Sequence, residues 1–395
     1  MTARQPQAPS PASPRHELSA RALATLAAGP GDPGILEILA HTRLSYTRSL
    51  VAHVSGLGAE GTDAELSRAA ADGWALLCRL DRTHPDAVRE IFTHPFTSAW
   101  AHRCLRPPLG GNGSLDRAHL GGLAAAAALR AGTSAEVVVP IREGALHLPT
   151  LGALRVTPGA AATATVSVEA GEAWASGAVW QSARRVTGPV IRAALEDLDP
   201  FRDCQNWPTT ARLAAAEHQT WDRAVMAAGS RLAADVPGYA AVLGAGLRSI
   251  VPLRTTPAAN RSSTARQAFG AVALTLPAQE DDLAALLLHE FQHVKLHALT
   301  GICDLFDTAE ARRLPVGWRA DPRPIEGVLH GTYAHLALAH LARAQEGPAA
   351  RARYLQYRSW VCDAAAALSA SAALTPEGEY FVAEMAAAAQ AHADG

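Results

Sequence analysis

The sequence predicts an α+β protein that is mostly helical and has a small antiparallel sheet. Apolar residues recur at helical spacing through most of residues 16–131 and again from about residue 210 onwards. Between these regions, residues 132–194 hold short segments rich in β-branched residues and interrupted by Gly and Pro, which is typical of hairpins. A His-Glu-x-x-His sequence lies within the second helical region.

Composition limits the kinds of partner. The chain has 395 residues and a formal charge of −2, so nothing indicates a general affinity for nucleic acid or for an anionic membrane. Its five cysteines are scattered and never form C-x-x-C, which favours reduced thiols and a cytoplasmic location. No apolar run is long enough to span a bilayer.

Changes in pattern along the chain predict four regions. Residues 1–15 are rich in Pro, Ala and Ser and are expected to form a disordered tail. A helical region follows at 16–131, and a small antiparallel β region at 132–194. Residues 195–395 are expected to form the catalytic region, which ends in helices.

The His289-Glu290-x-x-His293 sequence is the strongest candidate for a functional site. On a helix, His289 and His293 are about 40° apart around the axis, so both imidazoles can reach one metal ion. Glu290 lies close enough to the open side of that ion to move a proton or orient a bound ligand. We therefore predict His289 and His293 as metal ligands and Glu290 as a catalytic residue.

A predicted strand precedes this helix. Residues 268–276 alternate as a strand should, and Pro277 ends the alternation. A strand, a short turn and a metal-binding helix follow one another in this order in zincin-like folds, where the strand lies along the cleft. An extended peptide can pair with such a strand, so Phe269 is a candidate substrate contact.

Two other residues on the helix are expected not to bind the metal. His297 lies about 12 Å along the axis from His289, too far for both to bind one ion. Lys295 is the only lysine in the chain and points away from the histidine pair. An ion pair or a cap on nearby carbonyl groups is the better interpretation for Lys295.

The next predicted helix offers a third ligand. His330 is favoured because Gly327 and Gly331 beside it allow two helices to approach closely. Glu326 comes second, since an acidic residue is expected in a first helical turn in any case. His335 lies about 140° from His330 and cannot share its face, so it is the least favoured.

Several segments together resemble the actinobacterial H-E-x-x-H peptide-modification family. The most specific are a D-P-R-P segment and an L-H-G-x-Y-A-H segment downstream of the metal helix. The resemblance covers most of the chain from about residue 16 and is strongest from residue 195 to residue 340. The matching stretches are residues 195–203, 237–239, 268–274, 288–299, 318–324, 327–336 and 374–382.

The resemblance implies an iron(II)/α-ketoglutarate-dependent oxygenase that uses O2 to hydroxylate a side-chain β-carbon in a ribosomally synthesised precursor peptide. It also implies a possible radical-SAM maturase in the same pathway. Arginine binds a carboxylate through two hydrogen bonds, so Arg319 and Arg323 are candidates for the distal carboxylate of α-ketoglutarate. Ser263, Thr264 and Tyr333 are further candidates for polar contacts in the cleft. Of these, Tyr333 is a candidate substrate contact.

Two other functions remain open from the residues alone. The first is a zinc peptidase of gluzincin type, in which Glu290 activates a zinc-bound water and Glu326 is the third ligand. The second is a leader-peptide-binding or scaffold protein in which the His-Glu-x-x-His sequence has no catalytic role.

Overall fold

The computed structural model describes residues 18–57, 63–106, 113–157, 159, 161–255, 260–278 and 280–391. The predicted tail, residues 1–15, lies outside these ranges. The described part is α+β and mostly helical, as predicted, and its sheets are largely antiparallel. No helix in this part is both long enough and apolar enough to cross a membrane.

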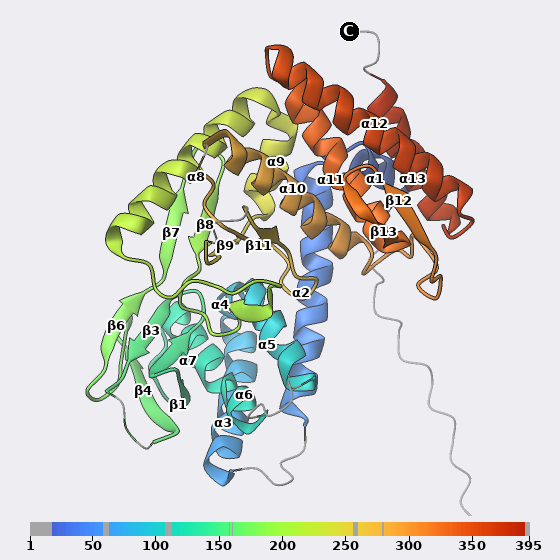
Figure 1. The fold of residues 1–395 in the computed structure, drawn as a ribbon. Helices are drawn as coiled ribbons and strands as arrows, with labels where there is room; N and C mark the ends of the chain where they lie inside the picture. Colours follow the sequence, from blue (N-terminus) through green and yellow to red (C-terminus); the bar gives the residue numbers. More distant parts are fainter. Residues whose placement is uncertain are drawn as a thin grey trace, which may run out of the picture.

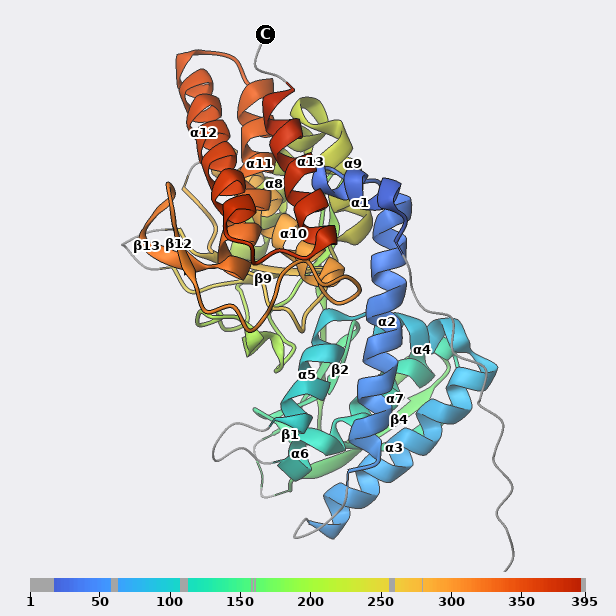
Figure 2. The same ribbon diagram turned by 90° about the vertical axis from the view of Figure 1, so that its right-hand side faces the viewer.

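The chain begins with a helical region in which α2 is the longest element. In Figure 1 and Figure 2, α2 runs from the part of the molecule that holds α10 to α13 down to the part that holds α3 to α7. Asp32 caps its N-terminus by accepting a hydrogen bond from the Ile35 backbone N–H. The helices are α1 (Ala20–Ala27), α2 (Pro33–Ser55), α3 (Ala64–Thr83), α4 (Pro85–Phe92), α5 (Pro95–Leu105), α6 (Gly113–Ala118) and α7 (Leu120–Ala131).

An antiparallel sheet packs against α7. Its strand order is β5-β4-β1-β2-β3-β6. Gly121 of α7 permits the close approach, because a Cβ there would lie 2.1 Å from the Val138 carbonyl oxygen. The strands are β1 (Ala135–Arg142), β2 (Ala145–Leu148), β3 (Gly152–Arg155), β4 (Thr163–Glu169), β5 (Glu172–Trp174) and β6 (Val179–Ser182).

A second sheet, of mixed direction, packs against helix α10 (Glu280–Leu299). Its order is β10-β11-β9-β8-β7, with β9 parallel to both β8 and β11. The segment predicted as one small sheet is therefore divided, because β8 pairs with β9 and β7 pairs with β8, and neither pairs with β6. Strand partners are set by distant residues, which local pattern does not reveal. The strands are β7 (Arg184–Thr187), β8 (Arg192–Leu195), β9 (Ser249–Pro252), β10 (Ser262–Ser263) and β11 (Ala271–Leu274).

The rest of the chain is a helical layer with one hairpin, β12 (Arg313–Val316) and β13 (Arg319–Pro324). Helix α10 packs on α8, α11 and β11. A short 3-10 helix, η1 (Arg202–Cys204), precedes this layer. The helices are α8 (Ala215–Asp235), α9 (Pro237–Gly246), α10 (Glu280–Leu299), α11 (Ile325–Ala344), α12 (Pro348–Ala370) and α13 (Pro376–Gln390).

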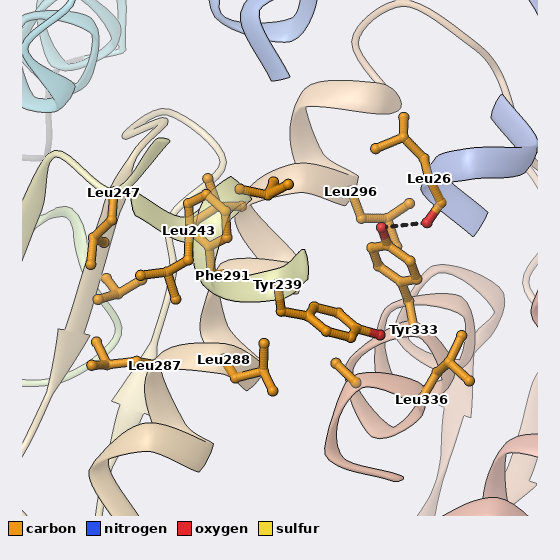
Figure 3. Packing of buried hydrophobic residues seen from close by; sticks show 14 of the residues in the cluster. Leu26, Tyr239, Leu243, Leu247, Leu287, Leu288, Phe291, Leu296, Tyr333 and Leu336 are labelled. Atoms are coloured by element: carbon orange, nitrogen blue, oxygen red, sulfur yellow. Dashed lines mark hydrogen bonds between the residues drawn. The ribbon is translucent and has the colours of Figure 1, made fainter. Parts of the chain in front are cut away.

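One face of α10 is part of the larger hydrophobic core. Leu287, Leu288 and Phe291 are buried there against α9, and Figure 3 shows them beside Leu243 and Tyr239. Burying apolar side chains of this size contributes about 1.5–3 kcal/mol each. The opposite face of the helix is thereby fixed in orientation, and it carries the histidines.

Lys295 holds α10 to the N-terminal region. Its Nζ lies in the interior and donates to the carbonyl oxygens of Gly29 (2.6 Å) and Pro30 (3.0 Å), so the capping interpretation agrees with the structure. Its ammonium group also lies 5.1 Å from the centre of the Tyr333 ring. Burial lowers the pKa of Lys295 well below its ordinary value.

Candidate metal centre

Helix α10 presents His289, His293 and His297 in one row, each half-buried. The Nε2 atoms of His289 and His293 lie 3.1 Å apart. Two imidazole nitrogens bound at about 2.1 Å to one ion would be about 3 Å apart in a roughly right-angled arrangement. The pair therefore has the spacing that a single metal ion requires.

Glu290 completes this first set. Ligand atoms of His289, Glu290 and His293 all lie within 4.8 Å of one another. Burial raises the pKa of the Glu290 carboxyl to about 7, although a hydrogen bond from Ser262 on β10 opposes the rise. Near neutral pH, Glu290 can therefore either hold or accept a proton, as a catalytic acid or base must.

His330 on α11 approaches the same row from the other side. Its Nδ1 lies 3.2 Å from Nδ1 of His293, whereas Nε2 of His293 faces His289. His330 instead falls into a second set, in which ligand atoms of His297, Glu326 and His330 lie within 4.8 Å of one another. Binding of His330 to the same ion as His289 and His293 stays a prediction, and it requires one ring to turn.

His335 forms part of an aromatic wall beside His289. Its Nδ1 donates to the Gly331 carbonyl at 2.7 Å, and its ring stacks on Trp318 at 4.6 Å. The His289 ring meets it edge-on at 5.6 Å. A Cβ at Gly331 would come within 2.4 Å of the Trp318 ring, so glycine there makes room for this wall.

The imidazoles of this region are neutral at physiological pH. Burial lowers the pKa of His289 to about 3, with a further contribution from His335. Burial also lowers the pKa of His293 and His330 well below the ordinary value. Because metals bind the neutral imidazole, the structure keeps these histidines in the form that binds a metal.

The predicted cofactor arginines already have a partner. Arg319 and Arg323 on β13 both bond to Asp321, at 3.0 and 3.2 Å, in an exposed part of the hairpin. Arg266, between β10 and β11, pairs with Glu326, and its charge contributes to the lowered pKa of His297 and His330. No local sequence pattern singles out Arg266, because only the fold brings its loop to α11.

The predicted substrate contacts are Tyr333 and Phe269. Tyr333 is buried, and its hydroxyl donates to the Leu26 carbonyl at 2.7 Å (Figure 3), so its ring is part of the core. Phe269 is partly buried beside a cavity of about 30 Å³ that α2 and α5 also line. Ser263 donates to Gln205 at 3.3 Å. Its neighbour Ser262 points to the opposite face of the strand and reaches Glu290.

These residues form a histidine-rich cluster with two neighbouring groups that could hold a metal ion, one on α10 and one between α10 and α11. Comparisons of the sequence with models of known protein families and with curated proteins give no match. The function must therefore be inferred from the chemistry of the site.

Proposed function

We propose that the chain is an iron(II)- and α-ketoglutarate-dependent oxygenase that hydroxylates a side-chain β-carbon in a ribosomally synthesised precursor peptide. The observation that carries the proposal is the His289–His293 pair, with Nε2 atoms 3.1 Å apart and the Glu290 carboxyl beside them. Two imidazoles and a carboxylate are the donor set of many non-haem iron oxygenases. In this proposal the core formed by β10, β11 and α10 is zincin-like.

The donor set fits iron(II). His289 and His293 would hold the ion, and either the Glu290 carboxylate or His330, after its ring turns, would complete the protein ligands. Glu326 and His335 are the remaining alternatives for that position. With α-ketoglutarate and O2, a bound iron(II) ion supplies the oxidising power that a C–H bond requires.

The residues of the chain would orient the reactants. Glu290 can share a proton with a neighbouring ligand because its pKa is near 7. An arginine would bind the distal carboxylate of α-ketoglutarate. For Arg319 or Arg323 this requires Asp321 to release one of them. The charge of Arg266, by contrast, already acts on His330, so Arg266 is the first arginine to test.

The edge strand beside Glu290 supports an extended peptide substrate. Strand β10 forms one edge of the described sheet and pairs with β11 on its other side. A peptide could add to this edge through its backbone, which would bring its side chains near Glu290. A leader segment of the peptide, and a radical-SAM maturase acting on the same peptide, belong to the same proposal.

The test is a reaction of the full chain with iron(II), ascorbate, α-ketoglutarate and the peptide encoded by a small open reading frame beside the gene. The expected result is a peptide heavier by one oxygen atom and one succinate for each hydroxylation. His293→Ala should abolish both products, while His53→Ala, on the exposed side of α2, should retain them. Hydroxylation by the His293→Ala variant at the wild-type rate would contradict the proposal.

A zinc peptidase is the second candidate, and the near-neutral pKa of Glu290 favours it, because a base that activates zinc-bound water needs such a pKa. Its third ligand would be Glu326. In the structure Glu326 lies with His297 and His330 and pairs with Arg266. Zinc-dependent cleavage of the peptide without succinate would select this function over the oxygenase.

A further inference from the structure

A second set of metal-binding groups lies beside the first, between the same helices. His293 and His297 are four residues apart on α10, and Glu326 and His330 are four residues apart on α11. Each spacing places two side chains on one helix face, and these faces meet because α10 packs on α11. Ligand atoms of His297, Glu326 and His330 converge to within 4.8 Å of one another.

Two nitrogens of this set are buried without a hydrogen-bond partner. They are Nε2 of His330 and Nδ1 of His297, in rings whose centres lie 4.3 Å apart. His330 is only 7% exposed. A buried polar atom without a partner is unfavourable, and buried polar groups in native proteins are almost always satisfied. A bound cation is the partner that would satisfy lone pairs on two neutral imidazoles at once.

We propose that His297, Glu326 and His330 form a second divalent-metal site, distinct from the His289–Glu290–His293 set. Two imidazoles and one carboxylate suit zinc, iron(II), cobalt(II) or nickel(II). His293 lies between the two sites, with Nε2 towards His289 and Nδ1 towards His330. The inference does not depend on the oxygenase reaction, because it concerns the number of ions that the chain binds.

Arg266 is the residue that competes with the ion. Its guanidinium pairs with Oε1 of Glu326, and both side chains are exposed, with 52% and 41% of their surface accessible. An ion at the site would bind the Glu326 carboxylate, with which Arg266 already forms an ion pair. Removing the guanidinium should therefore strengthen ion binding at the second site and leave the first unchanged.

The test is metal stoichiometry of the full chain. Protein freed of metal with a chelator is titrated with zinc by calorimetry, and bound zinc is measured after desalting. The wild type should bind two ions per chain. His297→Ala, Glu326→Gln and His330→Ala should each bind one, His289→Ala should bind one, and the control His53→Ala should bind two.

The opposite results are equally specific. A single ion in the wild type that His297→Ala and Glu326→Gln both retain would overturn the second site. Loss of all zinc in Glu326→Gln or His330→Ala would also overturn it, because that residue would then be the third ligand of a shared ion. Peptide hydroxylation by a wild-type protein that binds a single ion would leave the proposed function intact and reject only this inference.

Arg266→Gln offers a test that does not remove a ligand of the second site. Because Arg266 is exposed, the variant should fold as the wild type does. In a His289→Ala background, where only the second site remains, the ion should bind roughly two- to fivefold more tightly once Arg266 is also replaced by Gln, the range expected from the loss of one exposed ion pair. Unchanged or weaker binding of that ion would contradict the site.

Discussion

Two histidine clusters among the described residues differ in what the imidazoles face. The junction cluster lies where α5, α7, β2 and the end of β8 meet, and the α10–α11 cluster is the candidate metal centre. The junction cluster consists of His94, His119, His147, Glu196 and Asp199. The α10–α11 cluster consists of His289, Glu290, His293, His297, Glu326 and His330.

The junction cluster carries its own negative charge. His94 bonds to Asp199 at 3.1 Å, and the Asp199 carboxylate also accepts from the Phe201 backbone N–H. The carboxylate of Glu196 accepts from two backbone N–H groups. Nδ1 of His147 lacks a partner, but among the described residues it belongs to no set of converging ligand atoms. In this cluster His94 and His147 each have a hydrogen-bond partner within the protein.

In the α10–α11 cluster, imidazole faces imidazole. His293 has a histidine nitrogen within 3.2 Å on each side, and neither neighbour is a carboxylate. Burial without compensating charge is what keeps these rings neutral. The contrast shows that burial of histidines does not by itself identify a binding site. The identifying feature is a set of converging lone pairs that the protein leaves unsatisfied.

The largest expected effect is on the junction cluster. His94→Ala should lower the free energy of unfolding by about 3–5 kcal/mol, because Asp199 is left buried without its partner. Urea denaturation monitored by circular dichroism measures the change. Adding Asp199→Asn should restore part of the loss. If His94→Ala costs less than 1 kcal/mol, the ion pair is not what stabilises this junction.

Metal binding should distinguish the clusters next. Zinc at a hundredfold excess over its dissociation constant should stabilise the wild type by about 2.7 kcal/mol per site. His94→Ala should keep this response despite its lower stability, whereas His289→Ala should lose the part due to the first set. The shift in thermal unfolding with and without zinc measures it. An equal response in both variants would remove the distinction between the clusters.

The contributions of the two clusters to the free energy of unfolding should change with pH in opposite directions. The pKa of His289 falls to about 3 in the folded protein, so its contribution is present above pH 6.5 and is lost as the pH falls. For His94, burial favours a lower pKa, but the hydrogen bond and charge of Asp199 outweigh it and raise the pKa. Its contribution is present below pH 6.5 and is lost as the pH rises.

Metal-free protein tests this difference. Between pH 6.5 and 5, the wild type should lose about 2 kcal/mol of unfolding free energy relative to His289→Gln. Above pH 6.5, it should lose stability relative to His94→Gln. Urea denaturation across this range provides both comparisons. The same sign of pH dependence for both variants would show that one of the pKa shifts has been assigned the wrong direction.

The sequence allowed the α+β class and the His289–Glu290–His293 arrangement to be predicted, because both depend on local spacing. A helix of 3.6 residues per turn fixes the relative positions of residues four apart, whatever they pack against. Lys295 was also placed correctly away from the histidines, by the same angular argument.

What depends on distant contacts could not be predicted. His297 was excluded from the metal by its distance to His289, yet that distance does not prevent it from meeting His330 across the helix pair. Tyr333 was predicted as a substrate contact, and the sequence did not reveal that its hydroxyl meets the carbonyl groups of Leu26, in α1, and Gly29, after it. Arg266 and Ser262 reach the cluster only because β10 pairs with β11.

The smallest expected effect concerns the one carboxyl of the first set. Glu290 receives a single side-chain hydrogen bond, from Ser262, whereas the junction carboxylates accept from several donors. That bond favours the ionised form, so Ser262→Ala should raise the pKa of Glu290 further above its ordinary value. A net hydrogen bond of about 0.5–1.5 kcal/mol corresponds to a shift of about half to one unit.

Stability against pH can detect this shift in metal-free protein. Because the folded pKa of Glu290 is raised to about 7, its contribution is present below pH 4.5 and is lost as the pH rises to about 7. In Ser262→Ala the loss should continue to about pH 8, while the matched control Ser263→Ala, which bonds to Gln205, should follow the wild type. Identical profiles for Ser262→Ala and Ser263→Ala would mean that burial alone determines the pKa of the Glu290 carboxyl. In that case the carboxyl of the metal centre would have no partner of its own, and the contrast with the junction cluster would be sharper still.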